Sequence, residues 1–363
     1  MIATSKKRLG VHVVGALGGF TLLGFLVWNV GITEVTHYLY QIGWFAPLLL
    51  LPYFGVAWCD AKGWACAIPV PAQTLRVPVW RLSLARLAGE AINNLTPTAN
   101  LGGEPVKVYL LRTHGIAADA GLASVVVAKT ALTVSQIVFI LLGLPFFLYR
   151  LGWIRRDWWI LVPLFVLAYG FVSLLIRWQR QGLMEKAIGL FKWLLPRWQT
   201  LDHWEEGARR IDAHLLSFYD GNTRGFLAST FYHFLGWLLG AVEIWFFLFL
   251  MGVPIAPADA LIIEAMVQPF GAAALIVPGA LGVREAGGVF LCRLLGLDEG
   301  AGLTLMALVR VREAVYNLVG LAVIARFSGA LLPRKDSLGI EQQQDANQHY
   351  QRGPDIRSQS RPE

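Results

Sequence analysis

Two polar stretches interrupt an otherwise apolar chain and carry the side chains best suited to bind a ligand. Residues 86–112 read RLAGEAINNLTPTANLGGEPVKVYLLR, and residues 277–293 read VPGALGVREAGGVFLCR. Both combine charged residues with proline and glycine, which a helix that only anchors a protein in lipid does not need. A charged side chain at the centre of a membrane helix costs about 2.5–3.5 kcal/mol. We therefore expect these groups to pair with one another or to face a water-filled cavity.

The spacing of the charged residues indicates how the first stretch is arranged. Arg86, Glu90 and Asn94 follow one another at intervals of four residues and share one face of a helix. Glu104 and Lys107 fall in the first turn of the helix that follows the proline and glycines, and the N-terminal end of a helix favours an anion. This pattern is typical of a site for an anionic group.

Two later helices repeat the arrangement with polar residues on one face. Lys129 and Gln136 are seven residues apart, and so are Arg310 and Asn317, with Glu313 between the last two. The second polar stretch adds a further arginine and glutamate. The residues predicted to bind a lipid head group are Arg86, Glu90, Asn94, Glu104, Lys107, Lys129, Arg284, Glu285, Arg310 and Glu313.

Proline and glycine mark the points where each polar stretch turns back. Proline ends a helix because it lacks an N–H group, and glycine permits tight turns and the close approach of a ligand to the backbone. We predict two re-entrant helical hairpins, at about Leu82–Leu111 and Ala258–Leu297. The residues predicted to break them are Pro97, Gly102, Gly103, Pro278, Gly279 and Gly282.

The balance of charge decides which ligand the site suits. With Arg312 included, six cations stand against four glutamates in these segments. A positive balance favours a phosphate-bearing lipid head group. Two alternatives remain: the charges pair only to hold the hairpins together, or Lys107 extends to the membrane interface. Asp60, among other aspartates, is isolated in the sequence.

Composition predicts the class of protein that positions these groups. The chain has 363 residues, of which 56% are hydrophobic and 15% charged, whereas soluble domains average about 25% charged residues. We predict an all-α polytopic membrane protein with about six transmembrane helices. The expected spans are Leu9–Val30, Trp44–Lys62, Leu122–Leu148, Trp158–Ile176, Phe226–Leu250 and Thr304–Ala325.

The distribution of Lys and Arg predicts the topology. Basic residues gather between spans where cytoplasmic loops carry them, above all in the amphipathic segment 177–225. Arg150, Arg155 and Arg156 in a predicted outer loop are the exception. We expect a bacterial inner-membrane protein with both termini in the cytoplasm. The transmembrane domain is predicted at 1–332, and the polar tail 333–363 is predicted to be disordered.

An internal repeat relates the two polar stretches. Sliding the chain along itself until Pro97 meets Pro278 also aligns Glu104 with Glu285, together with many glycines and cations. We call the difference between the residue numbers of Pro278 and Pro97 the repeat offset. The repeat halves are about 44–148 and 226–327. The predicted topology inverts one half relative to the other, as in transporters whose site lies between broken helices near the midplane.

Motifs for other chemistry are missing from the sequence. It has no Walker A motif, no dinucleotide fingerprint and no H-E-x-x-H. The three cysteines, Cys59, Cys66 and Cys292, lack metal-ligand spacing. The formal charge of +7 comes mainly from loops and does not indicate nucleic-acid binding. We expect no metal and no cofactor, and a transporter rather than an enzyme.

The motifs also carry a family resemblance. The segments GEAINNLTPTANLGGEPVK, VPGALGVREAG and LVRVREAVYNLVGL resemble the lysylphosphatidylglycerol synthase/flippase transmembrane-domain family. The resemblance covers the region from the first to the sixth predicted span. It implies a multi-pass inner-membrane protein related to those that move aminoacylated phospholipid. Members of that kind also carry a soluble synthetase domain, which is not found in this sequence, so we expect a stand-alone member that does not transfer aminoacyl groups.

Three functions remain open at this point. The first is a translocase for an anionic or phosphate-bearing lipid: a phospholipid, an aminoacyl-phospholipid or a polyprenyl-linked lipid. The second is a membrane-embedded transferase with Glu90, Glu104 or Glu285 as general base, and the third is an accessory subunit of a lipid-synthesis complex. The expected partners are membrane lipids, with a second copy of the chain or lipid-synthesis enzymes as further options.

Overall fold

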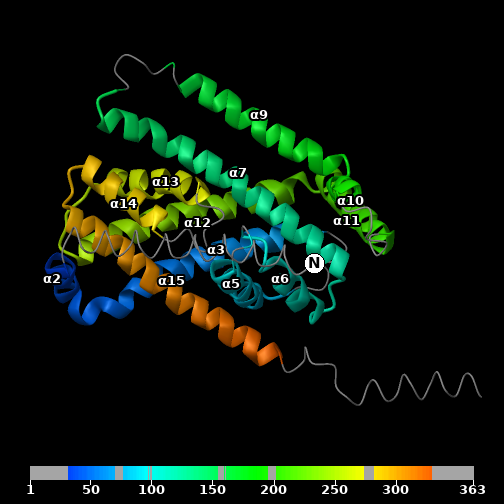
Figure 1. Cartoon of the computed structure of the whole chain (residues 1–363), viewed down its shortest axis with the longest axis horizontal. Helices are drawn as coiled ribbons and strands as arrows, with labels where there is room; N and C mark the ends of the chain where they lie inside the picture. The colour runs from blue at the N-terminus through cyan, green and yellow to red at the C-terminus, as the bar shows by residue number, and fades with distance from the viewer. Residues whose placement is uncertain are drawn as a thin grey trace, which may run out of the picture. The chain divides into compact units, whose positions relative to one another are not determined.

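The computed structural model describes residues 32–69, 77–96, 98, 100–153, 159, 161–194, 202–273 and 282–328. These residues form helices joined by turns, without a strand, as predicted for an all-α membrane protein (Figure 1). The helices are α2 (Ile32–Ile42), η1 (Gly43–Leu50), α3 (Leu51–Ala67), α5 (Val79–Leu95), α6 (Glu104–Arg112), α7 (Ala118–Arg150), α9 (Leu161–Arg180), α10 (Leu183–Leu194), α11 (Asp202–Gly221), α12 (Thr223–Leu250), α13 (Pro257–Ala273), α14 (Val283–Leu294) and α15 (Glu299–Ser328).

Four helical segments in the described part of the chain are long and apolar enough to cross a membrane. They are Thr36–Ala67, Ala118–Arg150, Leu161–Arg180 and Thr223–Leu250. Each contains, or nearly contains, one of the spans predicted from the sequence. The predicted span Leu9–Val30 lies outside the described residues. The predicted span Thr304–Ala325 falls in α15, a 30-residue helix that carries Arg310, Arg312 and Glu313 within four residues.

The first hairpin is built from two helices that touch through glycine. Asn93 accepts a hydrogen bond from the backbone N–H of Gly103 (2.7 Å), and Thr98 accepts one from that of Gly102 (2.8 Å). These side chains satisfy backbone groups at the turn, where the regular helix has stopped. Asn100 completes the turn with a φ of 60°. Helix α6 then begins at Glu104 with Pro105 in its first turn, a position proline tolerates well.

The second arm of each predicted hairpin is short. Helix α6 has 9 residues and α14 has 12, so at 1.5 Å per residue they extend about 14 and 18 Å. The hydrocarbon core of a bilayer is about 30 Å thick. Neither arm is long enough to cross it. Gly282, with a φ of 80°, is the N-cap of α14, whereas Pro97, Pro278 and Gly279 lie outside the described residues.

The order of helices recurs along the chain. Helices α3, α5, α6 and α7 are followed later by α12, α13, α14 and α15, and the first residues of α7 and α15 are separated by the repeat offset. Helices α3 and α12, which would be equivalent, pack against each other. Gly55 lies against Leu239 and Gly63 against His233. Because one residue number rises as the other falls, the two helices are antiparallel.

The amphipathic segment 177–225 forms α10, α11 and the start of α12. Helix α11 buries Leu215 and Phe218 against Ala123 and Val127 of α7. A chain of hydrogen bonds ties three helices together here: Tyr219 of α11 donates to Gln179 of α9 (2.5 Å), and Gln179 donates to Thr130 of α7 (2.7 Å). Burial raises the pKa of Tyr219 to about 12, so this hydroxyl stays protonated and able to donate.

The contact between α5 and α6 requires glycine at position 103. A Cβ atom added to Gly103 would lie 1.8 Å from the carbonyl oxygen of Gly89, and backbone cannot move aside as a flexible side chain can. We expect Gly103→Ala to destabilise the protein by about 1–3 kcal/mol or more, as overpacking does. Thermal unfolding of detergent-purified protein measures the change.

Gly271→Ala is the matched control, because nothing lies within 4 Å of a Cβ added at Gly271. We expect its melting temperature to stay near that of the wild type. Equal melting temperatures for the wild type and Gly103→Ala would contradict the packing of the first hairpin.

Candidate functional site

The predicted head-group residues surround one cavity of about 520 Å³. It is lined from both predicted hairpins and from α3, α7, α12 and α15. All of the predicted head-group residues except Glu285 line it. Glu285 is buried and bonds to Arg310. The structure therefore brings these residues together, and their role in binding a head group stays a prediction.

Arg86 is the centre of the network in the first half of the chain. Its guanidinium contacts Asp60 of α3 at 2.5 Å and Glu90, one turn along α5, at 2.8 Å. Tyr53 donates a further hydrogen bond to Glu90 (3.1 Å). Asp60 also contacts Nδ1 of His233 on α12 (2.7 Å). Asp60 is thus far from isolated, because its partners come from two distant helices.

One ion pair occurs twice, once in each half. Lys129 of α7 donates to Glu104 of α6 (2.8 Å), and Arg310 of α15 donates to Glu285 of α14. The repeat offset separates the two cations, and it also separates the two carboxylates. Lys107 adds a second cation to Glu104 at 3.0 Å. In both halves the carboxylate lies in the first turn of a short helix, where the helix dipole also favours it.

The second half holds a denser group of arginines. Glu313 accepts hydrogen bonds from Arg284 (2.8 Å) and Arg310 (2.6 Å). Arg312 donates to both oxygens of Glu243, at 2.8 and 3.1 Å. This bidentate geometry is the strongest that a guanidinium makes with a carboxylate. Arg312 also lies 4.1 Å from the centre of the Tyr53 ring, a cation–π contact between the two halves.

Amide side chains form two further contacts between the halves. Asn94 of α5 donates to Asn317 of α15 (3.0 Å), and Gln136 of α7 approaches Gln268 of α13 (3.4 Å). Gln136 and Asn317 are equivalent residues, because the repeat offset separates them as well. Each therefore reaches from the last helix of one half to the hairpin of the other.

Three carboxylates of the cavity were not among the predicted site residues: Asp60, Glu243 and Glu264. Each is a charged residue within an apolar helix, so the cost of burial could have identified it from the sequence. With them, six carboxylates line the cavity with the six cations. The predicted excess of positive charge is therefore absent among the described residues, and the charges form a nearly neutral network.

Two arginines nevertheless keep a donor free. Nη1 of Arg86 and Nη2 of Arg310 are buried and have no hydrogen-bond partner in the described part of the chain. A buried N–H without a partner costs about 1–3 kcal/mol. Both arginines line the cavity, one from each half of the chain, so both nitrogens are candidate donors to a ligand.

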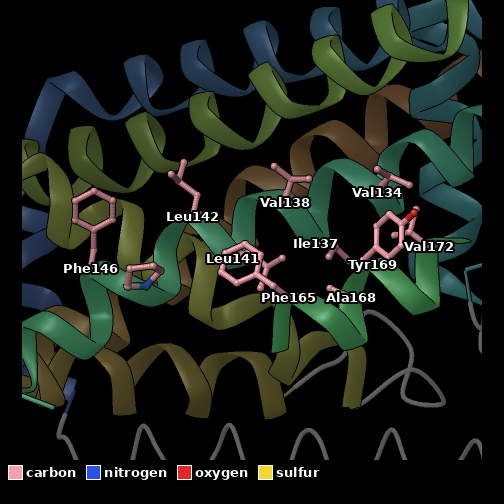
Figure 2. Close-up of a pocket in the computed structure, with 11 residues that line it drawn as sticks. Val134, Ile137, Val138, Leu141, Leu142, Phe146, Phe165, Ala168, Tyr169 and Val172 are labelled. Carbon is pink, nitrogen blue, oxygen red and sulfur yellow. The ribbon is translucent and has the colours of Figure 1, made fainter. Parts of the chain in front are cut away.

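A second hollow of about 570 Å³ lies between α7 and α9. Figure 2 shows its apolar lining, which includes Val138 and Leu141 of α7 and Phe165 and Val172 of α9. Leu132, Thr133 and Gln136 of α7 line the polar cavity and lie on the opposite face of the helix from Val138 and Leu141. Helix α7 thus separates a polar cavity on one face from an apolar groove on the other.

The ion pair between Asp60 and Arg86 gives a direct test of the buried network. Asp60→Asn keeps the shape of the side chain but removes the charge facing Arg86 and His233. Breaking a buried pair by removing one partner costs about 3–5 kcal/mol. We expect a marked fall in the thermal stability of the purified protein.

Asp220→Asn is the control, because Asp220 pairs with Arg180 where both side chains are about half exposed (46% and 56%). Exposed pairs are worth about 0–1 kcal/mol. Similar losses from the two substitutions would contradict a buried, tightly coupled network at Arg86.

Comparison with known proteins agrees with this architecture. Residues 10–320 match the family described as "Lysylphosphatidylglycerol synthase TM region". A "UPF0104 membrane protein" from Methanothermobacter thermautotrophicus is 29% identical over 136 residues, which cover 36% of this chain and 39% of that protein. The shared region is thus well under half of that relative's length. Because the family match extends over most of the chain, the protein belongs to the lysylphosphatidylglycerol synthase transmembrane-region family.

Proposed function

We propose that the protein is a lipid translocase that moves a phosphate-bearing lipid between the leaflets of a bacterial inner membrane. The observation that carries the proposal is the polar cavity, in which Arg86 and Arg310 each leave a buried guanidinium nitrogen unbonded. Arginine matches phosphate oxygens well in charge and geometry. The head group would enter this cavity while the acyl chains stay in the bilayer.

The cavity gives a head group a path through the apolar interior. Moving a charged head group through hydrocarbon without partners is very costly. Cations from both halves line the cavity, so the phosphate would exchange water for guanidinium and ammonium groups. The nearly neutral network also suits a head group that carries a phosphate together with hydroxyl or amino groups. The lipid is therefore a phospholipid, an aminoacyl-phospholipid or a polyprenyl-linked lipid.

We further propose that the halves 44–148 and 226–327 form an inverted repeat with two re-entrant hairpins. The antiparallel packing of α3 and α12, the recurring ion pairs and the short α6 and α14 support this arrangement. In such repeats, one half rocks against the other and opens the site to each side in turn.

The ion pairs of the cavity lie within single halves, which is compatible with rocking. Among the described residues at the cavity, every ion pair between Lys or Arg and a carboxylate joins two residues of the same half. The halves meet through neutral hydrogen bonds, the contact of Asp60 with His233, the stacking of Arg312 on Tyr53 and the packing of α12 against α3 and α7. The halves also pack closely against each other where α12 lies along α3 and α7, so the ion pairs belong to single halves while the boundary is mainly apolar and neutral.

A membrane-embedded transferase is the second candidate. It would use Glu90, Glu104 or Glu285 as general base, but cations already occupy all three carboxylates. The described residues contain no group of three or more His, Cys, Asp and Glu side chains placed to hold a metal ion. These observations favour the translocase, and we propose a second copy of the chain or a lipid-synthesis enzyme as its further partner.

Neutralising either recurring carboxylate should slow lipid movement. Glu104→Gln leaves Lys129 and Lys107 without their carboxylate, and Glu285→Gln does the same to Arg310. We expect each variant to insert in the membrane and to move lipid at least about tenfold more slowly, which corresponds to about 1.4 kcal/mol. The assay follows fluorescent phosphatidylglycerol between leaflets of reconstituted vesicles.

Glu299→Gln is the control for both variants, because Glu299 forms an exposed pair with Arg293 outside the cavity. It should move lipid at the wild-type rate. Wild-type rates in Glu104→Gln and Glu285→Gln would remove both carboxylates from the site.

Cysteine labelling tests the inverted repeat. Arg112 and Arg293 are exposed, equivalent residues at the ends of α6 and α14. We expect a single cysteine at position 112 to react with membrane-impermeant reagent from the cytoplasmic side, and one at 293 from the outer side. Cys59, Cys66 and Cys292 are first replaced by alanine. Labelling of both positions from one side would rule out the inversion.

A further inference from the structure

Glu264 of α13 differs from the other carboxylates of the cavity in its partners. Each of the others forms an ion pair with lysine or arginine. Within the described residues, no lysine, arginine or histidine forms an ion pair with Glu264, whose side chain lies deep in the protein (7% exposed). Its hydrogen-bond partner is the side-chain amide of Gln268, one turn along the same helix, at 2.8 Å.

The surroundings of Glu264 leave room for a carboxyl group but supply no paired cation. On α12, Gly240 lies so close that an added Cβ would be 3.1 Å from the Glu264 oxygen. From α7, Gln136 reaches Gln268 and not the carboxyl itself. The charged groups that face Glu264 from α12, α14 and α15 are Glu243, Arg284, Arg312 and Glu313. Both arginines and both glutamates of this set are already paired with one another.

A buried carboxylate without a paired cation is stabilised less than its paired neighbours, so it takes up a proton more readily than they do. Glu264 lines the same cavity as the two arginines that keep a free nitrogen. Its charge therefore acts on any ligand in that cavity. Adding a proton from water converts the carboxylate to a carboxylic acid and removes one negative charge.

We propose that Glu264 is a proton-binding site and that one proton binds together with each anionic lipid head group. The inference rests on the proposed translocase function and adds its coupling ion. Protonation makes the cavity more positive by one charge, so it strengthens the binding of an anion. By reciprocity, a bound anion strengthens proton binding to the same extent.

Binding of one proton together with each head group determines what drives transport. A head group with one negative charge and one proton crosses as a neutral pair. Movement then follows the pH difference across the membrane and does not respond directly to the membrane potential. Release of the proton to water on the far side restores the carboxylate and weakens the hold on the lipid.

Proton uptake by the purified protein tests the site. The probe is short-chain phosphatidylglycerol, added to weakly buffered protein in detergent with a pH indicator. Over a series of pH values that spans ionisation of the empty site, we expect the wild type to take up a maximum of about one proton for each lipid bound. We expect its affinity to fall by up to about tenfold per pH unit as the carboxyl ionises. Glu264→Gln should bind lipid without proton uptake and with an affinity that does not vary with pH.

Glu299→Gln is again the control and should behave as the wild type does. Absence of proton uptake by the wild type would overturn the proposal, and this measurement needs no variant to fold. Equal proton uptake by Glu264→Gln would also overturn it, because another group would then be the proton site.

A transport assay separates this inference from the proposed function. Phosphatidylcholine vesicles that contain fluorescent phosphatidylglycerol are prepared with and without a pH difference. We expect the pH difference to speed lipid movement by the wild type and to have no effect on Glu264→Gln. Movement by the wild type that ignores the pH difference would overturn proton coupling while leaving the translocase intact. No movement by the wild type under either condition would overturn the translocase itself.

Discussion

The cost of burying ionised side chains governs the arrangement of these helices. Six lysines and arginines lie around one cavity in a chain that is 56% hydrophobic. Each would be strongly unfavourable alone in a membrane, and each is stabilised by a carboxylate from a neighbouring helix or the next turn. Helices α3, α5, α6, α7, α12, α14 and α15 must all lie where these pairs can form. The pairs therefore fix the architecture as well as the site.

The recurrence of one pairing in both halves has a mechanical consequence. Lys129 with Glu104, and Arg310 with Glu285, fasten the short second arm of each hairpin to the long helix that follows it. Between the halves, the polar contacts include amide hydrogen bonds such as Asn94 with Asn317, and α12 packs along α3 and α7. The proposed movement of one half against the other would leave these ion pairs intact.

The sequence predicted the elements well, and it predicted the partners of single residues less well. Hydropathy and length identified the apolar spans in α3, α7, α9 and α12, because a long run of apolar residues is typical of a helix that crosses a membrane. The repeat offset aligned Glu104 with Glu285 before their cations were known to be equivalent.

Asp60, in contrast, was predicted to be isolated, because its partners Arg86 and His233 lie on other helices, far from it in the sequence. The charge balance was misjudged for the same reason. Glu243 lies in the apolar helix α12 and Glu264 in α13, the first helix of the second predicted hairpin. Neither was counted with the charges of the polar stretches, and the fold brings both to the cavity.

The most direct test is an electron cryomicroscopy map of the wild-type protein in nanodiscs that contain phosphatidylglycerol. The map shows both the depth of the bilayer and any lipid in the cavity. We predict that Arg86 and Arg310 lie at the depth of the hydrocarbon core, with the phosphate of a lipid between their free nitrogens. Arginines that lie in bulk water beyond the lipid belt, or α5–α6 and α13–α14 that cross the bilayer as ordinary spans, would contradict the account.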